Sequence, residues 1–317
     1  MDFLPVFAKM VELFLIVIIS YVAARFGVMN RTVKASLSKI ILNISLPCTI
    51  LASVASAKDF PTGPQLAKLL AVSFSSYLVL YILAKITGVI LGFKGKQRGA
   101  AEFGIMFCNV GFIGYPVTQA IFGNDTLLYT TMFNLPFNLL CYSLGVSMIT
   151  GGSEKKNNEE KANYLEKLKS ILLTPAMIAS IVALIMALAQ VKPPVLLGDT
   201  FTIVGGITTP GALLVIGAAL AEMPVKDMFS NAKAYIYTLI SVIITPLIIF
   251  AIYRPFTADD PLLLGVAVII SAMPVATAGT MLCVEYGGDE KLMAQVTFLT
   301  TVISVITIPL LAVLLPS

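Results

Sequence analysis

The sequence predicts an all-α membrane protein of ten transmembrane helices, arranged as two five-helix repeats of opposite orientation. Hydrophobic residues make up 58% of the 317 residues and charged residues only 12%, whereas about a quarter of the residues in soluble domains are charged. The charges fall into short gaps between long apolar runs, the pattern of spanning helices. Runs such as LFLIVII lack the polar–apolar alternation that a membrane β-barrel requires.

Five spans are expected before residue 150, as helices because lipid offers no partners for unpaired backbone groups. The first follows no basic leader and contains no small-residue cleavage site, so we interpret it as a span and not as a signal peptide. Pro47 interrupts the second, a basic run follows the third, and Pro116 interrupts the fourth. The approximate bounds are 5–26, 36–56, 66–92, 100–122 and 126–149.

Five more spans are expected after the polar stretch 151–169, which we interpret as a cytoplasmic linker. Pro175 stands near the start of the sixth span, Pro210 interrupts the seventh and Pro274 the ninth. The approximate bounds are 170–189, 200–221, 233–253, 262–284 and 292–315. The linker therefore separates a first repeat, 1–150, from a second repeat, 170–317.

The basic residues predict the orientation. Every second gap is rich in Lys and Arg and holds fifteen of the 21, the opposite gaps hold five, and Lys85 lies within the third span near its inner end, where it can snorkel. The side richer in Lys and Arg is cytoplasmic. We therefore expect a multi-pass protein of the cell membrane with both termini on the extracytoplasmic side.

Composition also excludes several functions. The chain has no histidine, no nucleophile motif and no metal-ligand spacing, so neither an enzyme nor a metal site is predicted. Its four cysteines stand singly within apolar segments, as buried hydrophobes do. The net charge of +4 is spread over short loops and gives no basic face for nucleic acid. No cofactor is expected, and coupling to H⁺ or Na⁺ stays open.

Prolines occur in matching order in the two halves. Pro5 and Pro175 open the first and sixth spans, ISLPCTILASVAS corresponds to ITTPGALLVIGAAL, and the Pro116 segment corresponds to the Pro274 segment. Three matched pairs indicate a duplication. Because each copy has an odd number of spans, the second copy lies inverted in the membrane, an architecture found in many secondary transporters.

The fourth and ninth spans are predicted to be broken helices that cross near the midplane. Asn109, Gly111, Gly114 and Pro116 fall within eight residues, and Pro274 precedes a run of small residues. Non-helical backbone at membrane depth is tolerated only where it is buried in protein or lines a cavity. The half-helices that follow would offer free N–H groups and a partial positive charge, which suits a carboxylate.

Other polar residues in the spans are weaker candidates. Asn43, Thr209, and the pair Asn134 and Asn138 could face the substrate, or could instead hydrogen-bond neighbouring helices. Three acidic residues are candidates for ion coupling: Glu12, Glu102 and Glu285. For Glu102 and Glu285 the alternative is a solvated position at the end of a helix.

The string NVGFIGYPV, Asn109 to Val117, and the run from Met273 to Leu311 resemble the auxin efflux carrier family, which includes plant exporters of auxin and bacterial permeases for malate and similar acids. The resemblance implies that spans one, two, six and seven form a scaffold that also joins a homodimer. Spans three to five and eight to ten would form a moving transport domain, with the substrate at the crossing of spans four and nine. Their fold is related to that of the sodium symporters for bile acids.

The chain departs from the plant exporters at the same place. Those proteins have a proline-flanked pair of asparagines in span four, whereas Asn109 stands alone before Val110. The ninth span has Met273 before Pro274 and no asparagine, and the long hydrophilic loop of many plant members is replaced by about eighteen residues. These differences fit a compact bacterial type better and argue against auxin itself, so the predicted substrate is a malate-like or auxin-like carboxylate.

The sequence therefore favours an elevator-type secondary transporter for a small organic anion, embedded in the lipid bilayer. A sodium-coupled symporter of the bile-acid type and a passive anion channel are the alternatives. Asn109 and free N–H groups from Gly111 to Val117 would bind the carboxylate, with Pro274 to Thr277 facing them. The predicted substrate-binding residues are Asn109, Val110, Gly111, Phe112, Gly114, Tyr115, Pro116, Met273, Pro274, Ala276, Thr277, Asn43, Thr209, Asn134 and Asn138.

Overall fold

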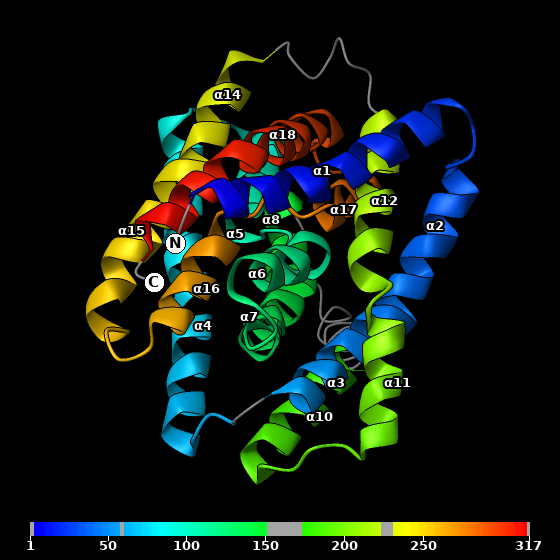
Figure 1. Ribbon diagram of the computed structural model, residues 1–317. Helices are drawn as coiled ribbons and strands as arrows, with labels where there is room; N and C mark the ends of the chain where they lie inside the picture. The colour runs from blue at the N-terminus through cyan, green and yellow to red at the C-terminus, as the bar shows by residue number, and fades with distance from the viewer. Residues whose placement is uncertain (1–2, 58–59, 151–172, 223–230, 316–317) are drawn as a thin grey trace, which may run out of the picture.

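The computed structural model describes residues 3–57, 60–150, 173–222 and 231–315. These residues form helices joined by short connections, and the part described contains no β-strand beyond one isolated bridge (Figure 1). The prediction of an all-helical chain is thus confirmed. The predicted linker 151–169 lies outside the described residues.

The first half contains long helices and several that are divided into pieces. The long ones, α1 and α4, correspond to single predicted spans, whereas the second, fourth and fifth spans each comprise two or three elements. The bounds are α1 Phe3–Arg25, α2 Arg31–Ile40, η1 Ile41–Ser45, α3 Leu46–Ser56, α4 Gly63–Ile90, α5 Gly95–Met106, η2 Val110–Gly114, α6 Tyr115–Phe122, α7 Thr126–Leu140, η3 Cys141–Gly145 and α8 Val146–Ile149.

The second half is divided in a similar way. Its last helix, α18, continues through Pro309 without interruption. The bounds are α10 Pro175–Ala189, α11 Val195–Gly205, α12 Thr208–Ala221, α14 Ala232–Leu239, η4 Ile240–Ile244, α15 Thr245–Tyr253, η5 Arg254–Phe256, α16 Pro261–Ser271, α17 Ala278–Tyr286 and α18 Glu290–Leu314.

Of the four π-helical turns in the described part of the chain, three end two residues before a proline. In η1, η2 and η4 the residue before the proline donates its N–H five residues back, as Tyr115 does to the Val110 carbonyl before Pro116. A proline has no N–H for the carbonyl four residues earlier and its ring crowds that carbonyl. The chain relieves the crowding by widening one turn, because i→i+5 bonding accommodates the extra residue. The same local chemistry therefore recurs in both halves.

Polar side chains mark the starts of several helices. Asn30, Thr174, Asp260 and Asp289 each accept a hydrogen bond from the backbone N–H three residues later. Such caps satisfy N–H groups that have no partner within the helix. Capping residues therefore fix where these helices enter and leave the bundle.

The helices pack closely where glycine allows it. Helix α12 contacts α1, α2 and η2, while α18 contacts α1, α5 and α14. A Cβ atom placed on Gly217 of α12 would lie 2.2 Å from the Val17 carbonyl oxygen of α1. The approach of α12 to α1 therefore requires glycine at this position, because any larger residue would force the two backbones apart.

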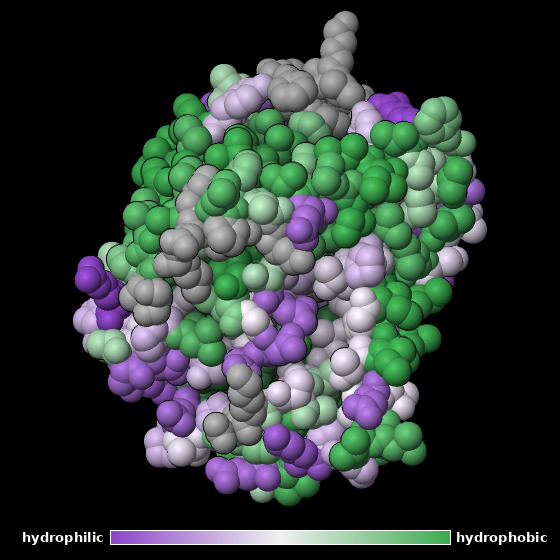
Figure 2. Space-filling view, in the orientation of Figure 1, coloured by the Kyte–Doolittle hydropathy of each residue, from purple (hydrophilic) through white to green (hydrophobic). Residues whose placement is uncertain are grey.

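Six helical stretches within the described residues are long and apolar enough to cross a bilayer. They are Arg31–Ser56, Gly63–Ile90, Thr126–Ile149, Val195–Ala221, Ala232–Phe256 and Glu290–Leu314. Figure 2 shows a broad apolar surface over the part of the molecule where α1 and α12 lie, with hydrophilic residues gathered toward the lower end of the view. On α1, apolar side chains such as Ile19, at 63%, are exposed, as is typical of a surface that faces lipid. The count of ten spans stays a prediction.

Candidate functional site

Helix α5 ends at Met106, and the chain becomes helical again only at Val110. Between them Phe107 and Asn109 have non-helical backbone angles, with ψ at 86° and 69°. The π-turn η2 and then α6 follow, with Pro116 as the second residue of α6. The predicted interruption of this segment is thus present in the structure, three residues long and wholly buried.

A second interruption separates α16 from α17. Helix α16 ends at Ser271, α17 begins at Ala278, and Pro274 lies between them. Met273 and Ala276 are buried at 0% and 2% exposure, so this non-helical backbone is enclosed by protein, as it must be at membrane depth.

The two interruptions contact each other through their backbones. Cys108 and Val275 form an antiparallel bridge. The N–H of Asn109 donates to the Pro274 carbonyl at 2.8 Å, and the N–H of Ala276 donates to the Phe107 carbonyl at 3.0 Å. Each non-helical segment therefore supplies partners for polar groups that the other segment would leave unpaired, which is how buried backbone is satisfied.

A side chain of α18 supports this contact. The N–H of Val275 donates to the Thr300 hydroxyl oxygen at 3.1 Å. Thr300 is fully buried, and nothing in its local sequence distinguishes it from the other threonines of α18. Sequence reasoning did not find this residue, because its role depends on which helix packs behind the interruption.

Asn109 has one satisfied and one unsatisfied side-chain atom. Its oxygen Oδ1 accepts from the Phe112 N–H at 3.2 Å and so caps η2. Its nitrogen Nδ2 is buried and has no hydrogen-bond partner among the described residues. Leaving a buried donor unpaired costs about 1–3 kcal/mol. The cost makes Asn109 the strongest candidate for contact with a bound molecule.

Open space adjoins Gly111, two residues after the buried Asn109. Gly111 and Phe112 are half-buried, as is Thr277 beside the other interruption. A Cβ atom placed on Gly111 would meet no heavy atom within 4 Å. Space for a ligand therefore adjoins η2, next to the capped turn.

The remaining residues of the first segment are packed more deeply. Val110, Gly114, Tyr115 and Pro116 are buried, and the Tyr115 hydroxyl donates to Thr131 of α7 at 3.1 Å. These side chains hold η2 and α6 against α7. From these positions they shape the site and leave little side-chain surface for a ligand.

Of the five other side chains with a buried, unpaired polar group among the described residues, two lie on elements next to the interruptions. Asn138 of α7 has a buried Nδ2 with no partner, and so has the Thr280 hydroxyl in the first turn of α17, within the described residues. Helix α7 contacts η2, so Asn138 belongs to an element of the site. Asn134, one turn earlier, is buried at 2% exposure. Thr280, which is not among the predicted substrate-binding residues, thus has an unpaired hydroxyl in the first turn after the second interruption.

Asn43 and Thr209 differ in exposure and in hydrogen bonding. Asn43 is exposed, and its Nδ2 donates to the Lys39 carbonyl of its own helix at 2.9 Å. Thr209 is half-buried at the start of α12, which contacts η2. Thr209 is therefore on an element next to the site, whereas the Asn43 amide is engaged by its own backbone.

The neighbouring Thr208 holds two divided helices together. Its hydroxyl lies 2.5 Å from that of Ser45 and 2.7 Å from that of Thr49, and the Thr49 hydroxyl donates to the Gly205 carbonyl at 2.9 Å. That carbonyl is left without a helical partner where α11 ends. Thr208 is the better-connected member of the Thr208–Thr209 pair, and the sequence alone does not distinguish them.

The three acidic candidates have different environments. Glu12 and Glu285 are exposed. Glu102 is 3% exposed and is ion-paired with Lys85 of α4 and with Arg98, whose Nε lies 2.7 Å from Oε1. Two cations therefore lie against one buried carboxylate within α5. Across the described ranges, no group of three His, Cys, Asp or Glu residues could hold a metal ion.

Comparisons with known proteins agree with this description. The sequence profile of a family described as "Membrane transport protein" matches residues 5–312. An uncharacterised transporter of Methanothermobacter thermautotrophicus is 24% identical over 314 residues, which cover 95% of each chain. An uncharacterised transporter of Methanocaldococcus jannaschii is 25% identical over 300 residues, covering 93% of this chain and 94% of the relative.

Proposed function

Because the chain belongs to the membrane transport protein family, the auxin efflux carrier family that its motifs resemble, we propose that it carries a small organic anion across the membrane. The protein is a multi-pass membrane transporter. The buried, unpaired Asn109 Nδ2, two residues before the open position at Gly111, is the observation that carries the choice of substrate class. A carboxylate oxygen would accept from this amide and relieve the cost of burying it.

The neighbouring groups support the same substrate class. Asn138 and Thr280 offer further unpaired donors, and α17 begins beside the interruption. The start of a helix carries partial positive charge, which favours an anion. No Lys or Arg lies in the segments 100–122 or 262–284. Because no fully charged cation would face the anion, neutral donors and helix ends would bind it weakly enough to release it on either side.

The proposed architecture follows the divided helices. Segments interrupted at matching places support an inverted repeat of ten spans, 1–150 and 170–317, with the fourth and ninth spans crossing at the site. We assign spans one, two, six and seven to a scaffold and homodimer contact, and spans three to five and eight to ten to an elevator-type transport domain. Both termini would face the extracytoplasmic side, with residues 151–169 in the cytoplasm.

Coupling and mechanism are open to a direct test. The site has neutral donors, and the residues that the structure describes contain no cluster of acidic groups that could hold a metal ion, so coupling to Na⁺ would need carbonyl and hydroxyl oxygens. A thermal-shift screen of mono- and dicarboxylates, with and without sodium, identifies the substrate and the coupling ion together. Stabilisation that requires sodium would favour the bile-acid type of symporter.

Counterflow in proteoliposomes separates a carrier from a channel. A carrier preloaded with unlabelled substrate accelerates the entry of labelled substrate, because the site returns loaded across the membrane. We expect such acceleration, and we expect free carboxylates to compete while neutral amides of the same shape do not. Flux unaffected by substrate on the far side would indicate a channel, and equal competition by the amides would reject the proposed anion site.

A further inference from the structure

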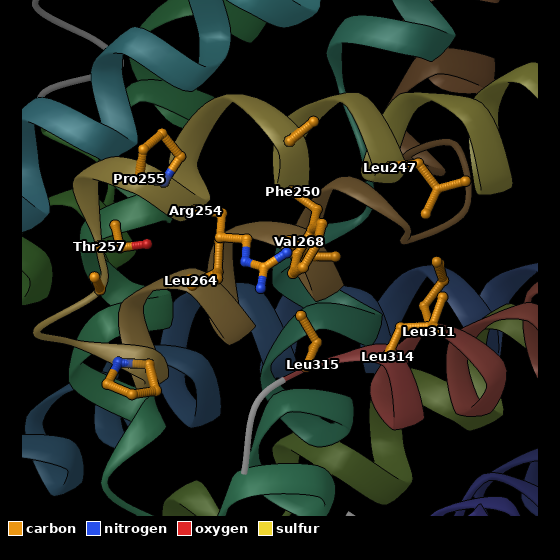
Figure 3. A pocket seen from close by; sticks show the side chains of 13 residues that line it. Leu247, Phe250, Arg254, Pro255, Thr257, Leu264, Val268, Leu311, Leu314 and Leu315 are labelled. Atoms are coloured by element: carbon orange, nitrogen blue, oxygen red, sulfur yellow. The ribbon is translucent and has the colours of Figure 1, made fainter.

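A groove of about 920 Å³ lies between α15, α16 and the C-terminal end of α18 (Figure 3). No residue of the two helix interruptions lines it. Its floor contains Leu264, Val268 and Leu311, which are 2%, 1% and 5% exposed. At its rim Leu247 is 40% exposed and Leu314 61%. The groove therefore opens onto the apolar surface of the protein.

Arg254 is the charged residue of this lining. Its guanidinium carbon lies 5.6 Å from the centre of the Phe250 ring, and Figure 3 shows the side chain reaching toward Phe250 and Val268. Among the described residues Arg254 forms no ion pair. Within the part of the chain that the structure describes, an exposed cation thus stands at an apolar groove without a carboxylate partner.

The nearby acidic groups are engaged elsewhere. Lys68 forms an ion pair with Asp259, and its hydrogen bond lowers the pKa of that carboxyl. Asp260 accepts from the Tyr129 hydroxyl at 3.2 Å and from the Leu263 N–H at 3.0 Å. Neither carboxylate pairs with Arg254, so the described lining of the groove carries one positive charge and no negative one.

The groove is amphipathic along its length. Arg254 follows the last residue of α15, at the end of the apolar stretch Ala232–Phe256, while Leu247 lies two turns farther into that stretch. A cation at the end of a spanning helix lies at the height of lipid head groups. Charge at that height, above apolar walls, matches a molecule with an anionic head and a hydrocarbon tail.

We propose that the groove binds an anionic phospholipid, with its phosphate on Arg254 and one acyl chain along α15 and α16. Arginine recognises phosphate through paired N–H donors, and basic pockets between spanning helices bind anionic head groups. The volume lies within the range of about 300–1,000 Å³ that is usual for small-molecule sites. The Thr257 hydroxyl already donates to the Tyr253 carbonyl at 2.8 Å, so Arg254 supplies the head-group contact.

The absence of tryptophan from the sequence allows a sensitive test. In Leu247→Trp the single indole lies in the groove, where phospholipids with brominated chains quench its fluorescence. In mixed bilayers of phosphatidylglycerol and phosphatidylcholine, with one lipid brominated at a time, we expect about fivefold preference for phosphatidylglycerol, the effect of one basic residue near an anionic lipid.

Two controls, Ile203→Trp and Lys192→Gln, change exposed positions outside the groove, and Arg254→Gln tests the head-group contact itself. Ile203→Trp places the indole on the apolar face of α11, where both lipids should quench equally. In the Leu247→Trp background, Arg254→Gln should abolish the preference. Lys192→Gln should preserve it, because Lys192 is also an exposed cation over a ring, 6.0 Å from the centre of Phe60, but does not line the groove.

Three results would overturn the proposal. Equal quenching by both lipids at Leu247→Trp would mean that only unselected bilayer lipid enters the groove. A preference that survives Arg254→Gln would remove the head-group contact. Stronger quenching by a brominated fatty acid than by brominated phosphatidylglycerol would identify the occupant as a free carboxylic acid. Arg254 is exposed, so its substitution does not threaten the packed core.

Discussion

Asn109 combines a structural and a binding role in one side chain. Its oxygen caps η2 through the Phe112 N–H, and its nitrogen remains unpaired in a buried position. The cap explains why an asparagine can stand at the interruption, and the free donor explains why it would bind an anion. An aliphatic side chain could make neither contact. A serine side chain is shorter and would reach less far toward the Phe112 N–H and toward a bound anion.

The open space beside Gly111 gives a prediction at the residue scale. In Gly111→Ala the added methyl group meets no protein atom within 4 Å, so the fold and the unfolding midpoint should be preserved. The methyl group would instead occupy the space proposed for the substrate. We expect kcat/KM for carboxylate transport to fall about tenfold, the usual effect of one extra carbon in a binding pocket.

A matched substitution checks that the effect depends on the site. Gly217→Ala adds the same methyl group where it would lie 2.2 Å from the Val17 carbonyl oxygen, far closer than atoms can pack. Its free energy of unfolding should fall by about 1–3 kcal/mol, which lowers the unfolding midpoint in detergent. Unchanged transport by Gly111→Ala would show that the space beside η2 is not part of the substrate path.

Glu102 gives a second prediction at this scale. Because it is buried between Lys85 and Arg98, Glu102→Gln leaves two cations without their counterion. We expect the protein to lose about 1–3 kcal/mol of stability, measured as the unfolding midpoint in detergent. Lys68→Gln, which breaks the exposed pair with Asp259, should change the midpoint little. Equal midpoints for Glu102→Gln and the unmodified protein would contradict this structural role.

At the scale of elements, the contact between the interruptions has a defined geometry. Two hydrogen bonds flank Cys108 and Val275, so these residues form a non-hydrogen-bonded antiparallel pair. Cα atoms of such pairs are about 4.5 Å apart, within the range of a disulfide. The native Cys108 should therefore cross-link to a cysteine in Val275→Cys under mild oxidation.

Cleavage between the halves makes this cross-link visible. After proteolysis within residues 151–169, the two fragments should migrate together without reductant and separate with it. Ala278→Cys, three residues along and in the first turn of α17, provides the control that should not cross-link to Cys108. Fragments that separate in the folded, oxidised Val275→Cys protein would contradict the contact.

Much of this element structure could be predicted from the sequence. The bounds 66–92 correspond to α4, Gly63–Ile90, and the prolines at 116 and 274 identify the two interrupted segments. The π-turns could not be predicted, because a proline can kink, widen or end a helix and the choice depends on its neighbours. In α18 the helix simply continues through Pro309.

The candidate site could be predicted only in part. The cluster around Asn109 stood out because several helix-breaking residues coincide, and the structure indeed places an unpaired donor there. The roles of Thr300 and Thr208 depend on which helices become neighbours, which no local pattern encodes. Asn43 illustrates the opposite case, since an amide in a span can bond to its own helix.

At the scale of the whole molecule, the proposed orientation predicts which loops can be labelled from outside. In a variant whose four cysteines are replaced by alanine, Ala258→Cys lies in the exposed loop between α15 and α16. It should react with a membrane-impermeant maleimide added to intact cells. Ser153→Cys, in the predicted cytoplasmic linker, should react only after permeabilisation. The reverse pattern would invert the orientation derived from the basic residues.

Transport by Asn109→Asp tests the central claim most directly. The aspartate keeps an oxygen for the Phe112 N–H, and this bond together with pH 8 favours the ionised form, against burial, which favours the neutral acid. The ionised side chain has lost the Nδ2 donor and repels an anion. Counterflow of the best carboxylate into proteoliposomes at pH 8 should show kcat/KM reduced at least about tenfold, with the unfolding midpoint preserved. Undiminished kcat/KM in this folded variant would contradict binding of the substrate at the helix interruption.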